Sequence, residues 1–279
     1  MADDINKRRW PDRPVKAYLD EEFLASRDAR PLRILSEFFE PASRFERFGV
    51  KDTIVFFGST RVVPREIAEK ELALAREQGT GLPAAERALV MSRYYEDARE
   101  LSRRLTEWSK SLGSEAGGRR FVVCSGGGPG IMEAANRGAS DAKGLNIGLN
   151  ISIPMEQHEN PYITRHLAFN FHYFFMRKFW FVYLAKALVI FPGGFGTLDE
   201  LFEVATLMQT RKVKKPMKLV LYGTDYWREV LNFDALVKHG TIDPEDVKLL
   251  TPVNDVESAY KAIIEHLSGK AIEEPGPRL

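Results

Sequence analysis

Short apolar segments alternate with helix-like segments along most of the chain, and this alternation restricts the possible folds more than any other feature. Runs this short and uniformly apolar are typical of strands that are covered on both faces. The runs are TIVFF from Thr53, FVVC from Phe121, NIGLNISIP from Asn146, ALVIF from Ala187 and KLVLY from Lys218. Helices are expected between them at residues 64–78, 94–112, 131–142, 174–186, 198–211 and 255–267. This order predicts an α/β fold, with a Rossmann-like doubly wound parallel sheet.

The first fifty residues differ from the rest of the chain. They are rich in Arg and Pro and carry only short apolar clusters, such as Phe38-Phe39. We therefore expect an N-terminal helical arm over residues 1–50, packed on the main body or on a partner subunit. The Rossmann-like domain is expected over residues 51–279, which is enough chain to bury a sizeable core.

The charge balance and the cysteine count exclude several classes of protein. Forty Lys and Arg stand against 39 Asp and Glu, so the chain lacks the basic excess of a nucleic-acid-binding protein. The single cysteine, Cys124, excludes an intrachain disulfide framework and paired-cysteine metal sites. The sequence has no uncharged apolar run of 18 residues and no apolar signal-peptide core near its start. We expect a cytoplasmic protein with no membrane span and no metal.

Two glycine-rich loops follow predicted strands and lead into predicted helices. The first glycine loop is SGGGPG (residues 125–130) and the second is PGGFGT (residues 192–197). Backbone N–H groups at such a helix start can approach an anion closely. Glycines also make ordinary tight turns, but two such loops at the ligand-binding edge of one sheet favour a phosphate site. Its expected contacts are Gly126, Gly127, Gly128, Gly193, Gly194, Gly196 and Thr197.

Neither loop fits the common nucleotide-cofactor motifs. The sequence contains no Gly-Lys-Ser or Gly-Lys-Thr, with which a Walker A motif ends, so neither loop is a Walker A loop. When the loops are aligned with the dinucleotide-binding motif G-x-G-x-x-G, the position of the third glycine is occupied by Ile131 in the first loop and by Asp199 in the second. The phosphate is therefore expected to belong to a substrate, and we expect no cofactor.

Two adjacent cations interrupt an otherwise apolar and aromatic segment. Arg177 and Lys178 lie within FHYFFMRKFWFVYLAKA, which predicts a buried helix. Buried cations need anionic partners, and these are either protein carboxylates in a structural ion pair or a bound phosphate. Both interpretations remain open on the residues alone.

Glu200 also has two interpretations. The segment from Thr197 to Glu200 matches a capping box, in which Glu200 would only bond back to the Thr197 backbone. Alternatively, Glu200, Glu203 and Thr206 form a polar stripe beside the apolar face of the helix. A carboxylate at the start of this stripe would reach a ligand held by the second glycine loop.

Several of these segments resemble the motifs of a known protein family. PGGFGTLDE at residues 192–200 resembles the PGGxGTxxE motif of the LOG family of phosphoribohydrolases, and MRK at residues 176–178 lies at the expected distance upstream. The first glycine loop and the segment after it also resemble this family, and the likeness extends over about 53–267. The chain is longer than the compact plant-type members and looks closer to the longer bacterial branch.

The resemblance implies a function and a role for each matching residue. The reaction is hydrolysis of the N-glycosidic bond of a nucleoside 5′-monophosphate, with AMP or a cytokinin riboside monophosphate as substrate. Arg177 and Glu200 are implied as the catalytic pair, and the products are free base and ribose 5-phosphate. The implied substrate contacts are Lys178, residues 193–197, Thr206 and Glu156. The resemblance also implies a homodimer or a higher homo-oligomer, and the aromatic stretch at residues 169–183 suits such an interface.

Two other functions remain possible from the sequence. A pyridoxal-phosphate lysine decarboxylase would need a Schiff-base lysine, for which Lys178 and Lys186 are the nominees. A non-catalytic nucleotide-binding or regulatory protein would use the same loops and cations. The presence of Glu200 favours an enzyme over this second alternative.

Overall fold

The computed structural model describes residues 14–113, 118–153 and 159–277, which divide into two units. The first unit extends to Ala42 and the second begins at Ser43. The described part of the first unit is helical: η1 (Ala17–Leu19), α1 (Glu21–Ala25) and the start of α2 (Arg30–Arg47). The Asp20 side chain accepts a hydrogen bond from the Phe23 N–H at 3.0 Å and so caps α1.

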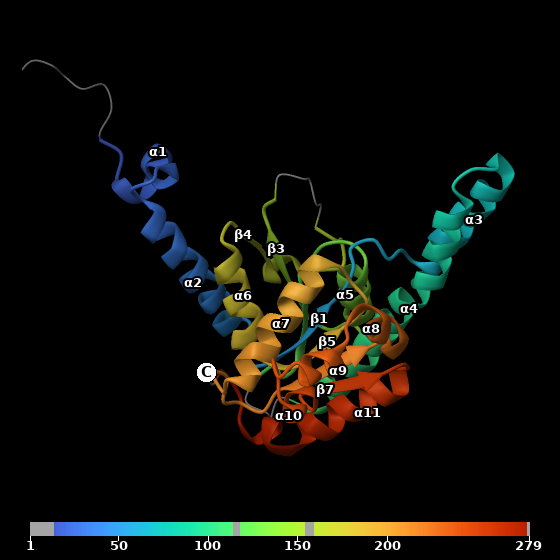
Figure 1. The fold of residues 1–279 in the computed structure, drawn as a ribbon. Coiled ribbons are helices and arrows are strands. Elements are labelled where there is room, and N and C mark those ends of the chain that lie inside the picture. Colours follow the sequence, from blue (N-terminus) through green and yellow to red (C-terminus); the bar gives the residue numbers. More distant parts are fainter. Residues whose placement is uncertain (1–13, 114–117, 154–158, 278–279) are drawn as a thin grey trace, which may run out of the picture. The chain divides into compact units, whose positions relative to one another are not determined.

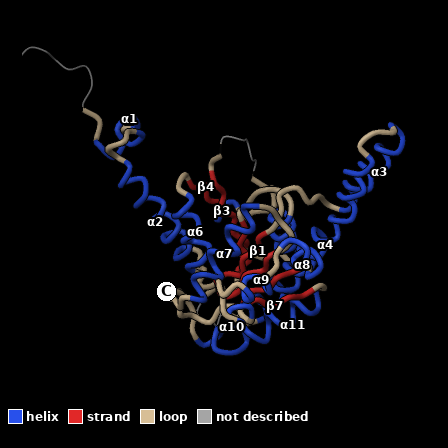
Figure 2. The backbone as a smooth tube through the Cα atoms, viewed as in Figure 1, coloured by secondary structure: helices blue, strands red, loops and turns tan. Residues whose placement is uncertain are grey.

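The second unit is built around one sheet with seven described strands, all parallel to their neighbours (Figures 1 and 2). This arrangement confirms the predicted doubly wound parallel sheet. The strands are β1 (Thr53–Phe57), β2 (Val122–Ser125), β3 (Asn146–Ile151), β4 (Ala168–Phe171), β5 (Ala185–Ile190), β6 (Lys218–Tyr222) and β7 (Leu250–Val253). The helices are α3 (Arg65–Gln78), α4 (Leu82–Ser111), α5 (Ile131–Asp141), η3 (Arg165–Leu167), α6 (Phe174–Tyr183), α7 (Phe195–Gln209), α8 (Thr224–Val230), α9 (Phe233–Lys238), α10 (Pro244–Val247), α11 (Val256–His266) and the π-helical turn η4 (Leu267–Ala271).

Helices cover both faces of the sheet, as the uniformly apolar strands require. On β1, Ile54 and Phe56 belong to a core cluster that α4, α5 and α11 complete on one face. Successive side chains of a strand point to opposite faces, so Phe57 points to the other one. There its ring lies 4.8 Å from the ring of Phe181 on α6. Residues of β1 are buried throughout because each face has its own helical cover.

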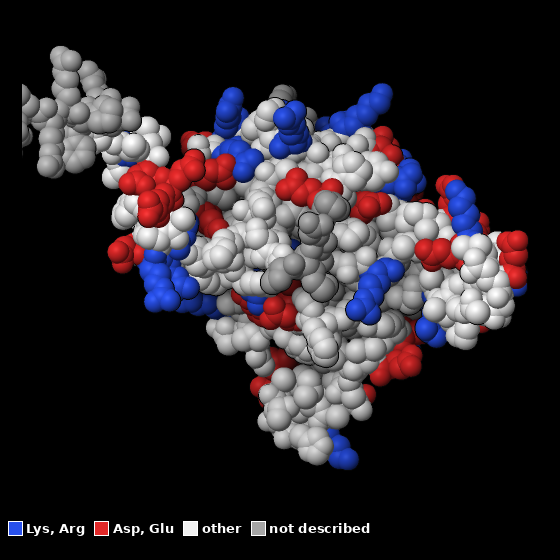
Figure 3. Space-filling view, turned by 90° about the horizontal axis from the view of Figure 1, so that it is seen from above, with Lys and Arg blue, Asp and Glu red and all other residues white. Residues whose placement is uncertain are grey.

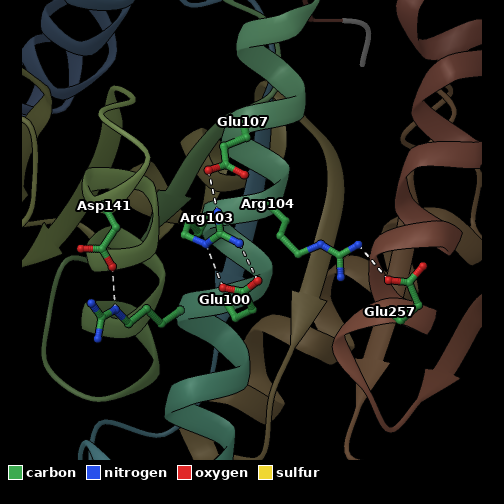
Figure 4. A network of polar contacts seen from close by, with 7 residues as sticks. Glu100, Arg103, Arg104, Glu107, Asp141 and Glu257 are labelled. Carbon is green, nitrogen blue, oxygen red and sulfur yellow. Dashed lines mark hydrogen bonds and ion pairs between the residues drawn. The ribbon is translucent and has the colours of Figure 1, made fainter.

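Ion pairs at the outer side of α4 hold that helix to its neighbours (Figure 4). Arg99 contacts Asp141 of α5 at 2.6 Å, and Arg104 contacts Glu257 of α11 at 2.8 Å. These side chains are partly exposed, so each pair contributes little to stability compared with the apolar core beneath. The N-terminal part of α4 forms a hairpin with α3, with a small core of its own at Leu72, Ala75 and Ala85.

The strand order places the ligand-binding edge of the sheet. The order is β4-β3-β2-β1-β5-β6-β7, so the chain proceeds outward in one direction from β1 and in the other direction from β5. The topological switch point therefore lies between β1 and β5. Ligands of open α/β sheets bind beyond the carboxyl ends of the strands at this point.

Three helix boundaries differ from the sequence prediction by three residues or more. The helix expected over residues 94–112 is α4, which begins at Leu82. The helix expected over residues 174–186 ends at Tyr183, and Ala185 and Lys186 belong to β5. Residues 179–185 are all apolar or aromatic, so their periodicity gives no sign of where the helix ends and the strand begins. The helix expected from residue 198 begins at Phe195, one turn earlier.

Candidate functional site

A cleft of about 700 Å³ lies at the switch point, entirely within the second unit. The segments that follow β1 and β5 form its central walls, at residues 57–61 and 192–200. Its remaining lining residues are Met91, Met132, Ile151, Ile153, Phe174, Arg177, Tyr226 and Val230. The cleft therefore lies at the edge of the sheet where the sequence predicts a ligand, and one of the two glycine loops lines it.

The second glycine loop opens α7 toward this cleft. Gly194 is the N-terminal cap of α7, and no side chain satisfies the first N–H groups of the helix there. Gly194 and Gly196 are exposed, and a Cβ added at either would meet no atom within 4 Å. Gly193 has a different reason to be glycine, because a Cβ there would lie 2.1 Å from the Thr197 hydroxyl oxygen. The positive end of α7 thus faces open space.

The predicted capping box at Thr197 and Glu200 is not formed. Because α7 begins at Phe195, both residues lie inside the helix and not at its cap. This removes the local structural explanation for Glu200 and leaves its position beside the cleft to be explained.

The Glu200 side chain is buried in the wall of the cleft. The residue is 7% exposed, and no hydrogen bond to its carboxylate occurs among the described residues. Burial raises the pKa of Glu200 to about 7, although the nearby charges of Arg177 and Lys178 oppose this rise. A carboxyl group with a pKa near neutrality is suited to accept a proton at physiological pH.

Arg177 lines the same cleft from α6 and is held in place on two sides. Its Nε donates to the Leu149 carbonyl oxygen at 2.7 Å, at the end of β3. Its guanidinium lies over the Phe181 ring at 5.0 Å and against Gly126, where an added Cβ would come within 2.5 Å of Nη2. Burial lowers the pKa of Arg177, and the charge of Glu200 partly offsets that effect. The two side chains share the cleft but form no direct ion pair in the described structure.

Lys178 is not among the lining residues of the cleft and pairs with two carboxylates of α7. Its Nζ contacts Asp199 at 2.8 Å and Glu203 at 2.9 Å. Burial alone would lower the pKa of Lys178, but the hydrogen bonds to these two carboxylates raise it to about 12. Lys178 therefore has protein partners, as the structural interpretation of this cation supposes. Thr206 lies two turns further along α7, exposed and outside the cleft.

The first glycine loop does not line the cleft. It packs against Arg177, which does. Gly126, Gly127 and Gly128 are buried. The Gly127 N–H donates to the Ser125 hydroxyl at 3.0 Å, and the Asn160 side-chain amide donates to the carbonyls of Gly127 and Gly128 at 3.0 and 3.1 Å. These bonds leave the loop's groups engaged with the protein. Glu156, the remaining predicted contact, lies outside the described residues.

Sequence reasoning missed the segment after β1, which we call the β1 loop (residues 58–61). It lies between the two glycine loops: the Ser59 N–H donates to the Pro192 carbonyl at 3.0 Å, and the Ser59 carbonyl accepts from Ile131 N–H at 3.1 Å. The glycine turn after TIVFF is visible in the sequence. Its importance depends on β1 being the neighbour of β5, which the sequence does not reveal.

Among the residues that the structure describes, no group of three or more His, Cys, Asp or Glu residues is arranged to hold a metal ion. No described helix is both long enough and apolar enough to cross a membrane.

Comparison with known proteins agrees with the resemblance in the motifs. The family model described as "Possible lysine decarboxylase" matches residues 132–263. The cytokinin riboside 5′-monophosphate phosphoribohydrolase of Rhodococcoides fascians is 29% identical over 148 residues, which are 51% of this chain and 72% of that protein. The pyrimidine/purine nucleotide 5′-monophosphate nucleosidase of Escherichia coli strain K12 is 30% identical over 139 residues, 45% of this chain but only 30% of that protein.

A solved structure with a related arrangement is the molybdenum cofactor binding protein of the phototrophic bacterium Rippkaea orientalis. It has a TM-score of 0.47 and 15% identity, over 77% of this chain and 98% of that chain. The family model spans the second glycine loop, Arg177 and Glu200, and with the relatives named above it agrees with the resemblance of this chain to the LOG family.

Proposed function

We propose that this protein hydrolyses the N-glycosidic bond of a nucleoside 5′-monophosphate to free base and ribose 5-phosphate. The observation that carries the proposal is the position of Glu200. Its carboxylate is buried, has no described hydrogen-bond partner, and lines the cleft into which the open N-terminus of α7 points. An anion-binding helix start and a proton acceptor therefore share one cleft.

The proposed mechanism assigns a role to each of these groups. The first N–H groups of α7 hold the 5′-phosphate and so fix the ribose above Glu200. As the bond between C1′ and the base nitrogen breaks, positive charge develops on the ribose. The Glu200 carboxylate stabilises this charge and accepts a proton from the water that attacks C1′. The base leaves with the electron pair of the broken bond and acquires a proton, and Arg177 orients Glu200 or assists this departure.

The relatives support this reaction over other chemistry on the same fold. Two named relatives, from Rhodococcoides fascians and Escherichia coli, are a phosphoribohydrolase and a nucleosidase that act on nucleoside 5′-monophosphates. The aligned part is about half of this chain in each case, so the transfer concerns the class of reaction and not the preferred base. AMP and cytokinin riboside monophosphates are the substrates to examine first.

Incubation with a panel of nucleoside monophosphates, followed by chromatography, tests the proposal. We expect stoichiometric release of base and ribose 5-phosphate from at least one nucleotide. Tight binding of the nucleotides with no base released from any of them would instead support a non-catalytic nucleotide-binding protein.

A pyridoxal-phosphate decarboxylase is the second alternative, and the positions of its two candidate lysines count against it. Lys178 is engaged by Asp199 and Glu203. Lys186 is fully buried in β5, where its Nζ donates to the Glu274 carbonyl at 2.8 Å. Neither lines the cleft. An absorption band of a Schiff base in the purified protein would revive this alternative.

A further inference from the structure

The cations that the family motif offers to a substrate phosphate already have protein partners. Lys178 is bound by Asp199 and Glu203, at 2.8 and 2.9 Å. Arg177 donates its Nε to the Leu149 carbonyl and lies near the charge of Glu200. Two protein carboxylates therefore already match the charge of Lys178, and Arg177 is held by a backbone carbonyl close to the charge of Glu200.

The cleft nevertheless needs such a cation. A nucleotide's 5′-phosphate carries close to two negative charges at neutral pH. In this cleft it would approach Asp199 and Glu200, which both line the wall. The face seen in Figure 3 carries acidic and basic side chains interspersed, with no broad basic patch to supply the attraction from a distance. The start of α7 contributes only about half a unit of positive charge.

Arg61, in the β1 loop, is placed to supply that cation. It lines the cleft, its side chain is exposed, and no carboxylate pairs with it among residues 14–113, 118–153 and 159–277. Its backbone is fixed: the Arg61 N–H donates to the Ser59 hydroxyl at 3.1 Å, and Ser59 is bonded to Pro192 beside the second glycine loop. These hydrogen bonds hold the Arg61 backbone in a fixed position close to the N-terminus of α7.

We propose that Arg61 binds the 5′-phosphate of the substrate across the cleft from the N-terminus of α7, and that it determines the preference for a nucleotide over a nucleoside. A guanidinium matches two phosphate oxygens at once, which suits this role better than a lysine ammonium. Arg61 is thus a binding residue, separate from the groups that act on the glycosidic bond. This inference rests on the proposed function, because that function places a phosphate in the cleft.

The test compares Arg61→Gln, Arg61→Lys and the control Arg65→Gln with the wild type. Arg65 is a nearby exposed arginine that pairs with Glu69 at 2.9 Å and does not line the cleft. Calorimetry gives the affinities for ribose 5-phosphate and adenosine, and for AMP it uses each variant in a Glu200→Gln background, so that AMP is not consumed during the titration. We expect Arg61→Gln to weaken binding of the two phosphates roughly 10- to 100-fold, which is the usual effect of losing a charged hydrogen bond. Arg61→Lys should weaken phosphate binding by an intermediate amount, and Arg65→Gln should bind both phosphates as tightly as the wild type.

Adenosine separates the possible outcomes. If Arg61 binds phosphate, its replacement leaves adenosine affinity unchanged and removes most of the preference for AMP. Equal weakening for AMP and adenosine, or no weakening for either phosphate, would overturn the inference even if the protein cleaves AMP. Failure of the proposed function would appear differently: no nucleotide would release base, while the binding comparison would still show whether Arg61 holds the phosphate.

Discussion

At the scale of single residues, Glu200 shows how local sequence can mislead. Thr197 and Glu200 match a capping box, yet the helix starts at Phe195 and the box does not form. A local sequence pattern shows only which hydrogen bonds a short segment is able to make, not which of them form in the fold. The start of α7 is set instead by Gly193, whose lack of a Cβ lets Thr197 and the Ser59 backbone pack against it.

The pH dependence of catalysis follows from the burial of Glu200. Burial raises the pKa of this carboxyl group to about 7, and the proposed mechanism needs the ionised form. The rate constant kcat/KM should therefore rise with pH and level off above about 7, and at pH 6 it should be about a tenth of its plateau. Initial rates of AMP hydrolysis between pH 5.5 and 8.5 provide the measurement. A rate that falls as pH rises through 7 would mean that Glu200 acts when protonated.

Gly126 gives a second prediction at this scale. A Cβ at Gly126 would lie 2.5 Å from Arg177 Nη2 and 2.6 Å from the Met132 sulfur. Gly126→Ala should therefore displace the Arg177 guanidinium and lower kcat by roughly 10²-fold, as expected when a catalytic group moves by about 1 Å. AMP affinity should change less than kcat, because the phosphate contacts lie elsewhere. Normal turnover by the alanine variant would show that the position of Arg177 is unimportant.

At the scale of elements, the sequence predicted most strands and helices but not all of their roles. It located β1, β2, β3, β5 and β6, but not β4 and β7, which are four residues long and only partly buried. It treated the two glycine loops as equivalent phosphate binders. Their difference arises from Asn160, a residue more than 30 positions away from the loop it holds, and such long-range hydrogen bonds leave no local pattern.

The Asn160 side chain should therefore stabilise the fold through the first glycine loop. This buried amide donates to the carbonyls of Gly127 and Gly128 and to the Asn136 side chain. Asn160→Ala leaves buried acceptors without partners and should lower the free energy of unfolding by about 1–3 kcal/mol. The matched control is Asn170→Ala, which removes an exposed hydrogen bond to Ser152 and should cost about 0.5 kcal/mol or less. Urea denaturation measures both, and equal effects would contradict this role.

At the scale of the whole molecule, the alternation of apolar strands and helices was sufficient to predict the fold class. Strand order was not predictable, because each strand is apolar on both faces and gives no sign of its neighbours. The sequence therefore indicated that ligands bind at the carboxyl edge but not that β1 and β5 form the switch point. For this reason Arg61 and the β1 loop emerged only from the structure.

Exposed aromatic side chains on the second unit predict a homo-oligomer. Phe175 on α6 and Phe202 on α7 are 55% and 40% exposed, on two helices that the Lys178 ion pairs hold side by side. Large exposed aromatic side chains are enriched at subunit interfaces. We expect light scattering to give at least a dimer, and Phe175→Asp to shift the protein toward monomer. A stable and fully active wild-type monomer would refute this expectation.

The turnover of Glu200→Gln tests the central claim most directly. Glutamine keeps the size of the side chain but removes the negative charge and the ability to accept a proton. If Glu200 acts on the glycosidic bond, the variant should fold, bind AMP through the α7 N-terminus and Arg61, and hydrolyse it about 10²–10⁴-fold more slowly than the wild type. The measurement is single-turnover release of adenine at saturating AMP. A folded variant that releases adenine at close to the wild-type rate would contradict the account.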